Sequence, residues 1–184
     1  HMALHRLRKL LGREEAITVN DGRLSLNPAL CWVDVWMAER VLNETEGTLD
    51  KALSGEALKA LAERTLRLFQ GLFLASEPDT SWILPMRERL RRKFARQLAG
   101  VGRRLEAAGR VGEAIDLYKR GLEHDGLAEE LYRCLIRACL ARGNRAEALD
   151  AYRRCRTMLS IVLGMAPSPE TEALRRTIDG EGDD

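Results

Sequence analysis

Two stretches of this sequence are variants of one another: Gly109-Arg110-Val111-Gly112-Glu113-Ala114-Ile115-Asp116-Leu117-Tyr118-Lys119-Arg120 and Gly143-Asn144-Arg145-Ala146-Glu147-Ala148-Leu149-Asp150-Ala151-Tyr152-Arg153-Arg154. The second copy follows the first at an offset of 34 residues, and the glycine, the Glu-Ala pair and the tyrosine keep their places. A period of this length is typical of units of two antiparallel helices, each of which buries its apolar side by stacking on a neighbour. The repeat therefore predicts an all-α fold of the kind that usually binds other macromolecules.

The period is that of the tetratricopeptide (TPR) helix pair. In such a pair the second helix needs a small residue where it approaches the first, and a large residue one turn later to fill the next gap. The second unit departs from the pattern, because Ile136 stands where the first unit has a small residue on its first helix. We expect a TPR-like right-handed array of antiparallel helix pairs, with less regular antiparallel helical hairpins as the alternative. The structural repeat positions are Gly102, Ala114, Tyr118, Ala148 and Tyr152.

Apolar residues recur at helical spacing from Asp34 almost to the end of the chain. We expect Gly47 to stop the first helix and the acidic residues 179–184 to form a disordered tail. The expected helices cover residues 34–46, 54–72 and 82–108, then start after Gly109, at Glu129 and after Gly143, and a closing helix runs from Ser168 or Thr171 to Ile178.

The N-terminal part has a different pattern. Residues 3–11 predict a short amphipathic helix stopped by Gly12. Residues 17–26 alternate apolar and polar side chains around Asp21-Gly22, the preferred dipeptide of a two-residue hairpin turn, so we expect Val19 to face Leu24. A lone hairpin is marginal in water. We therefore expect its apolar side, Ile17, Val19, Leu24 and Leu26, to pack on Leu4, Leu7 and Leu11 of the helix.

The composition narrows the class of protein. Of the 184 residues 45% are hydrophobic and 32% are charged. Because basic and acidic residues nearly balance, the net charge is only +2, and this value argues neither for nor against binding of nucleic acid. No run of apolar residues is long enough to predict a membrane span. The four cysteines form no Cys-x-x-Cys pair, which indicates reduced thiols packed as small apolar groups in a cytoplasmic protein. No motif for a nucleophile, a phosphate loop or a metal site stands out, so we expect no enzyme activity, cofactor or metal.

One segment is strongly basic. Residues 87–96 contain six positive side chains and one negative side chain. One interpretation is a surface that binds nucleic acid or an acidic partner. The other, which we favour, is that these charges are solvated and flank the apolar stripe of a long helix.

Several stretches together resemble one known family, the bacterial transcriptional activator domain, at its junction with a winged-helix DNA-binding domain. Such domains occur in the antibiotic-regulatory (SARP-type) activators and in larger regulators that also carry an ATPase. The residues that carry the resemblance are Leu4-His5-Arg6-Leu7-Arg8-Lys9-Leu10-Leu11-Gly12, the hairpin with Cys31-Trp32-Val33-Asp34-Val35, the motif Leu68-Phe69-Gln70-Gly71-Leu72-Phe73-Leu74 before Trp82 and Arg87, and the closing signature of residues 143–148 with Tyr152, Arg156, Leu159, Leu163-Gly164-Met165-Ala166-Pro167-Ser168 and Glu170-Thr171.

The resemblance implies a TPR-like activator domain at about residues 30–178, which acts through RNA polymerase, another regulatory domain or a second copy of itself. It implies that residues 3–27 are the end of a recognition helix and the wing, and His1-Met2 looks like the remainder of a cleaved tag. DNA is then a partner of the full-length protein, with little or no specific binding by this chain. The alternative is a TPR adaptor that binds a peptide without DNA. The candidate DNA contacts are Arg6, Lys9 and Arg23.

Overall fold

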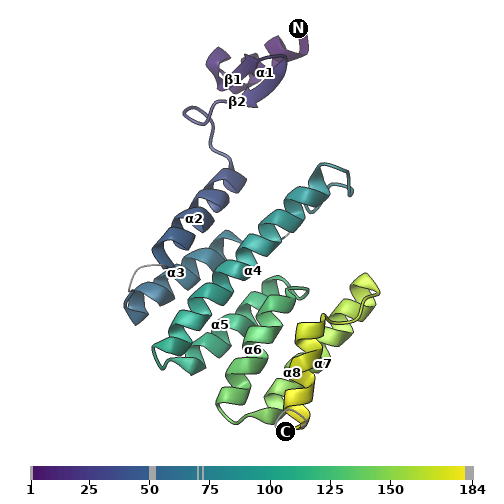
Figure 1. Ribbon diagram of the computed structural model, residues 1–184. Coiled ribbons are helices and arrows are strands. Elements are labelled where there is room, and N and C mark those ends of the chain that lie inside the picture. The colour runs from purple at the N-terminus through teal and green to yellow at the C-terminus, as the bar shows by residue number, and fades with distance from the viewer. Residues whose placement is uncertain (1, 50–52, 70, 72, 181–184) are drawn as a thin grey trace. The chain divides into compact units, whose positions relative to one another are not determined.

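A computed structural model describes residues 2–49, 53–69, 71 and 73–180 of the protein (Figure 1), with the side chains of 44–49 left aside. Within these residues lie eight α-helices, one 3-10 helix and one two-stranded antiparallel sheet. The chain divides into two compact units, residues 1–40 and residues 41–184. Each unit is described by itself below.

The first unit contains the expected helix and hairpin. Helix α1 (Met2–Leu11) is followed by the 3-10 helix η1 (Glu14–Ala16) and the strands β1 (Ile17–Asn20) and β2 (Arg23–Leu26). Asp21 and Gly22 both have positive φ angles, 50° and 75°, as a type I′ turn requires. The register pairs Ile17 with Leu26 and Val19 with Leu24, which confirms the predicted hairpin.

The expected packing of the hairpin on the helix is wrong. Helix α1 has no buried side chain and packs instead against η1. The Arg8 guanidinium fixes the helix to the strand by donating to the Ile17 carbonyl at 2.7 and 3.3 Å. Two such short elements enclose too little volume for a core, since a hairpin needs a larger partner to bury its apolar face. Of the hairpin's apolar side chains only that of Ile17 is buried, and those left exposed are Val19, Leu24 and Leu26, with Leu7 and Leu11 of α1.

Helices α3 to α8 form the array that the repeat predicts. Helices α4 and α5 make one antiparallel pair and α6 and α7 the next, while α3 packs on α4 and α5, and α8 packs on α6 and α7 (Figure 1). The fold is mostly helical and TPR-like, as expected. The bounds are α2 (Asp34–Leu49), α3 (Gly55–Leu68), α4 (Ile83–Ala107), α5 (Val111–His124), α6 (Glu129–Ala141), α7 (Arg145–Leu163) and α8 (Pro169–Asp179).

Two helix ends differ from the expectation. Helix α2 continues through Gly47 to Leu49, because an interior glycine weakens a helix by about 1 kcal/mol but does not by itself end it. Helix α3 ends at Leu68 rather than near residue 72: Phe69 leaves the helical conformation, and its ring stacks on Phe94 at 4.2 Å. Leu72, the expected last residue of this helix, lies outside the described residues, as do residues 181–184 of the expected tail. Residue 179, the expected first residue of that tail, is the last residue of α8.

The repeat positions meet at the closest helix contacts. Ala114 and Ala148 are fully buried, and so is Tyr118, whose ring lies against Gly102 so closely that a Cβ added to this glycine would overlap it. The two turns between paired helices are also alike, since Gly109 and Gly143 adopt φ angles of 75° and 74°. In both turns the residue after the glycine donates its backbone N–H to the carbonyl five residues back along the chain, as in a Schellman motif.

The two repeat tyrosines use their hydroxyl groups differently. The Tyr118 hydroxyl donates to Glu106 of α4, within its own helix pair. In the second unit the residue 34 positions after Glu106 is Leu140, which offers no acceptor, and Ile136 replaces the small Gly102. The Tyr152 hydroxyl donates instead to Glu172 of α8, at 2.8 and 3.0 Å. In the second unit, where Ile136 replaces the small residue, the tyrosine hydroxyl is therefore hydrogen-bonded to the helix that follows the pair.

The three cysteines of the helical unit are buried, as expected of thiols packed in a core. They are Cys134, Cys139 and Cys155, while Cys31 in the first unit is half-buried. Burial raises the pKa of the Cys155 thiol to about 12 and that of Cys139 to about 11, which makes both unreactive at neutral pH. Within the described residues no helix has the length and apolar character needed to cross a membrane.

Because Ala148 and Ala114 occupy contacts with no spare volume, we expect Ala148→Leu and Ala114→Leu each to lower the free energy of unfolding by about 1–3 kcal/mol through overpacking. Urea denaturation followed by circular dichroism measures the loss. The matched control is Ala141→Leu at an exposed position of α6, which should change stability little. If all three variants were equally stable, the faces of the helices would be assigned wrongly.

Candidate interaction surface

The basic run on α4 divides into structural and exposed arginines. Arg87 donates to the carbonyls of Phe73 at 2.7 Å and Glu77 at 3.1 Å, and pairs with Asp79. Its guanidinium therefore closes the turn that precedes α4. The expectation that the run is simply solvated is wrong for this residue, because a guanidinium with five donors can satisfy several loop carbonyls at once.

Arg91 is the second structural arginine. It holds Asp125, in the turn between α5 and α6, through two hydrogen bonds of 3.1 and 2.7 Å between the guanidinium and the carboxylate. The side chains of Arg91 and Asp125 are 18% and 8% exposed. Asp125 also accepts the backbone N–H of Leu127 at 3.1 Å. The bidentate pair, which raises the pKa of Arg91 through the hydrogen bond to Asp125, thus fixes the first turn between successive helix pairs to α4.

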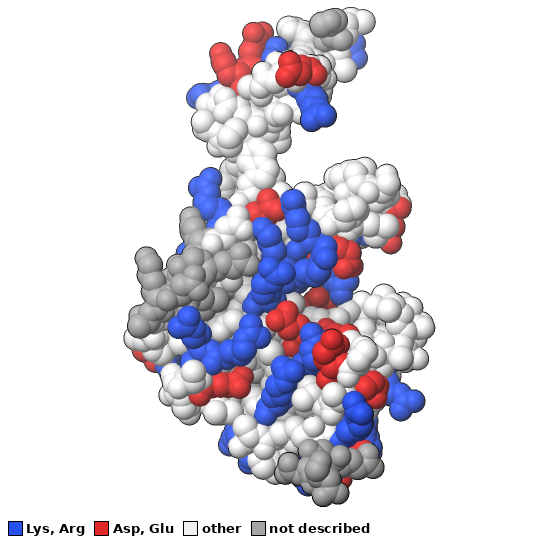
Figure 2. All heavy atoms as spheres, in the orientation of Figure 1, with Lys and Arg blue, Asp and Glu red and all other residues white. Residues whose placement is uncertain are grey.

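Four other arginines of α4 form one exposed strip, which we call the α4 arginine face. Their spacing of three, four and seven residues places them on one side of the helix, turned away from the core. Figure 2 shows Lys and Arg side chains gathered in a band over the position of α4 in Figure 1. The α4 arginine face consists of Arg89, Arg92, Arg96 and Arg103.

The face continues toward α6. The Arg103 guanidinium reaches across to Glu130 at 3.6 Å and to the Cys134 sulfur at 3.7 Å. Arg137, exposed on α6, lies one turn beyond Cys134. Planar guanidinium groups bind carboxylates and phosphates through paired hydrogen bonds, so this surface fits an acidic partner.

The predicted DNA contacts lie in the first unit, on its surface. Arg6 and Lys9 are exposed on α1 one turn apart, and Arg23 is exposed at the start of β2. Toward the described residues none of the three side chains forms a hydrogen bond or ion pair, whereas their neighbour Arg8 is held by Ile17. They are thus oriented outward, and they lie in a different unit from the α4 arginine face.

Other kinds of site are not assembled. Across the part of the chain that the structure describes, no group of three or more His, Cys, Asp and Glu side chains is arranged to hold a metal ion. The paired carboxylates near helix starts serve the structure: Glu129 accepts the backbone N–H of Ser168 at 2.7 Å and joins α6 to the start of α8.

The fold and surface define a class: a TPR-like helical array with an exposed arginine strip. Residues 33–179 match the bacterial transcriptional activator domain, and the chain belongs to that family. The structure of Mycobacterium tuberculosis EmbR in complex with a low affinity phosphopeptide is similar, with a TM-score of 0.64 and 24% sequence identity. The match covers 100% of this chain and 49% of the EmbR chain, so this chain spans about half of that protein. No curated protein matches the chain.

Because Arg91 and Asp125 are largely removed from water, we expect Arg91→Met to lower the free energy of unfolding by about 1–3 kcal/mol. The loss arises from leaving the Asp125 carboxylate without its partner. Arg92→Met, at the next and exposed position, is the matched control and should change stability by less than about 0.5 kcal/mol. Urea denaturation distinguishes the two, and equal effects would mean that the pair does not fix the turn.

Proposed function

We propose that this chain is part of a DNA-binding transcriptional regulator in which residues 33–179 contact a protein partner. The partner is RNA polymerase, a neighbouring regulatory domain or a second copy of the chain. The observation that carries the proposal is the family match over residues 33–179. The α4 arginine face supports it, because a row of guanidinium groups on a rigid helix is a surface suited to an acidic protein.

Residues 3–27 belong, in this proposal, to a winged-helix DNA-binding domain, as the end of its recognition helix and its wing. Two features of the first unit support this. Its apolar side chains, such as Leu10 and Leu24, remain exposed, which a larger domain would bury. Arg6, Lys9 and Arg23 face outward without partners among the described residues, as side chains that contact phosphates or base edges would.

We expect this chain to bind duplex DNA only weakly and without sequence preference, with a dissociation constant of about 10⁻⁴–10⁻⁶ M that rises steeply with salt. The 10 residues of α1, fewer than three helical turns, do not by themselves hold base-reading side chains in register. A gel-shift series at physiological salt measures the affinity. A preference above about a thousandfold for one promoter over random DNA would contradict the proposed division of labour.

Charge reversal tests the three candidate contacts in the same assay. Arg6→Glu, Lys9→Glu and Arg23→Glu together should abolish the residual binding and its salt dependence. The matched control reverses three exposed arginines of the helical unit, Arg67, Arg104 and Arg176, and should bind DNA more tightly than the first variant. Equal loss in both would mean that net charge alone accounts for the attraction.

Fusion to an unrelated DNA-binding domain tests the activator function. We expect residues 33–179 in such a fusion to raise transcription from a reporter carrying that domain's operator. Arg92→Glu with Arg96→Glu should reduce the increase by about tenfold, as loss of complementary charges at an interface does. The control is Arg67→Glu with Arg176→Glu, two exposed arginines on α3 and α8. A fusion without any activity would contradict the proposed protein contact.

A further inference from the structure

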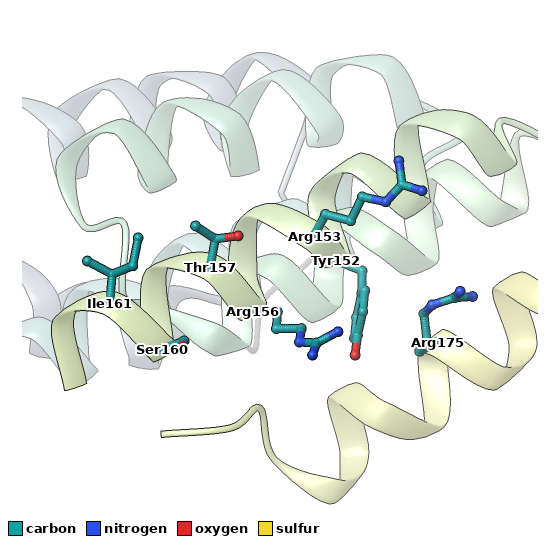
Figure 3. A pocket seen from close by; sticks show the side chains of 7 residues that line it. All are labelled: Tyr152, Arg153, Arg156, Thr157, Ser160, Ile161 and Arg175. Atoms are coloured by element: carbon teal, nitrogen blue, oxygen red, sulfur yellow. The ribbon is translucent and has the colours of Figure 1, made fainter. Parts of the chain in front are cut away.

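A groove of about 400 Å³ opens between α7 and α8. Three arginines line it, Arg153 and Arg156 from α7 and Arg175 from α8, and none of the described carboxylates does. Figure 3 shows Arg156 and Arg175 on either side of the Tyr152 ring, in the space between the two helices. The hydroxyl groups of Thr157 and Ser160 follow along α7.

The groove lies on a part of α7 whose equivalent in the first repeat, on α5, is covered by the following helix. Position 122, one turn after Tyr118, is a buried leucine, and the equivalent position after Tyr152 is the exposed Arg156. Likewise the partly buried Leu127 corresponds to Ile161, which is 77% exposed. Helix α8 therefore covers less of α7 than α6 covers of α5. Among the described residues, the α7 surface at Arg156 and Ile161 is left exposed, whereas Leu122 of α5 is buried.

The charges of the groove favour an anion. Arg156 forms no ion pair with any described residue. Arg175 pairs with Asp179 while its guanidinium lies over the Tyr152 ring at 5.7 Å, and Arg153 lies 3.9 Å from the exposed Asp150. The neighbouring Glu172 is bound by the Tyr152 hydroxyl. Arg156 is thus the guanidinium most open to a carboxylate from outside.

The far end of the groove is apolar. Helix α7 has 19 residues and α5 has 14, although both begin at the same place in the repeat. The extension ends in four exposed apolar side chains, of which the first lines the groove: Ile161, Val162, Leu163 and Met165. Exposed apolar side chains beside cationic groups are typical of a protein-interaction site.

We infer that the α7–α8 groove binds an acidic peptide segment of a partner protein, with a carboxylate on Arg156 and a large apolar side chain on Ile161. The volume fits a few side chains, whereas a DNA duplex would leave the apolar end without a matching surface. The site is distinct from the α4 arginine face, so the chain has two separate surfaces for acidic partners.

Fluorescence anisotropy tests this with a short labelled peptide of Glu-Glu-Leu repeats. We expect binding that weakens about tenfold or more in Arg156→Glu and in Ile161→Ser, since both residues form the anchor of the contact. The matched controls are Arg67→Glu at an exposed position of α3, outside both arginine surfaces, and Leu84→Ser at the exposed start of α4, which should bind as the unaltered chain does. Thermal melting checks that all four variants remain folded.

Peptide chemistry provides the second comparison. Glu-Glu-Ser repeats, which lack the apolar side chain, and Lys-Lys-Leu repeats should both bind at least about tenfold more weakly. Equal binding of Glu-Glu-Leu and Glu-Glu-Ser peptides, unchanged binding by Arg156→Glu, or an equal loss in Arg67→Glu would overturn the inference. The inference would also be overturned if random duplex DNA displaced the peptide from the unaltered chain but did not bind Arg156→Glu, because the groove would then bind nucleic acid. Each of these results leaves the reporter experiment, and with it the proposed function, unaffected.

Discussion

The helical unit depends on one close approach, that of α5 to α4 at Gly102. Because this residue has no side chain, the Tyr118 ring lies directly against the α4 backbone and its hydroxyl reaches Glu106. Burial of the ring and the hydrogen bond to the carboxylate both raise the pKa of this phenol, so it remains a donor over the whole physiological range. The small residue Ala114, one turn earlier, keeps the two helices at the same short distance. The position of every later helix follows from this pair.

Electrostatic contacts then join one pair to the next. Arg91 fixes the turn before α6, and Lys119 of α5 lies 2.5 Å from Glu147 of α7. The hydrogen bond to Lys119 lowers the pKa of Glu147, so the contribution of this carboxylate to stability is present at neutral pH and is lost as pH falls. Since both side chains are partly exposed, the pair orients the helices more than it stabilises them.

The sequence was sufficient to predict the array because the positions that repeat every 34 residues indicate where helices start and which of their faces are buried. The 34-residue offset between Gly109 and Gly143 predicted that a helix starts after each of them, and the Ala-Tyr spacing predicted which face is buried. Helical spacing places Arg91 on a different side of α4 from Arg92, but it could not identify the partner of Arg91, Asp125, which lies 34 residues away in the chain. The packing of the first unit was predicted wrongly for a related reason: alternation shows that a hairpin has an apolar face, but does not show what covers it. The α7–α8 groove emerges only when Arg156 is compared with Leu122.

The contact between Gly102 and Tyr118 also constrains how such a repeat can diverge. A side chain added at 102 meets the tyrosine ring, so the glycine cannot change first unless the ring has somewhere else to go. The second unit illustrates the alternative arrangement, with Ile136 on the first helix and the hydroxyl of Tyr152 bound to Glu172 of the following helix. Each arrangement thus depends on where the tyrosine hydroxyl finds its carboxylate: within the same helix pair when a glycine faces the ring, and on the following helix when an isoleucine stands at that position.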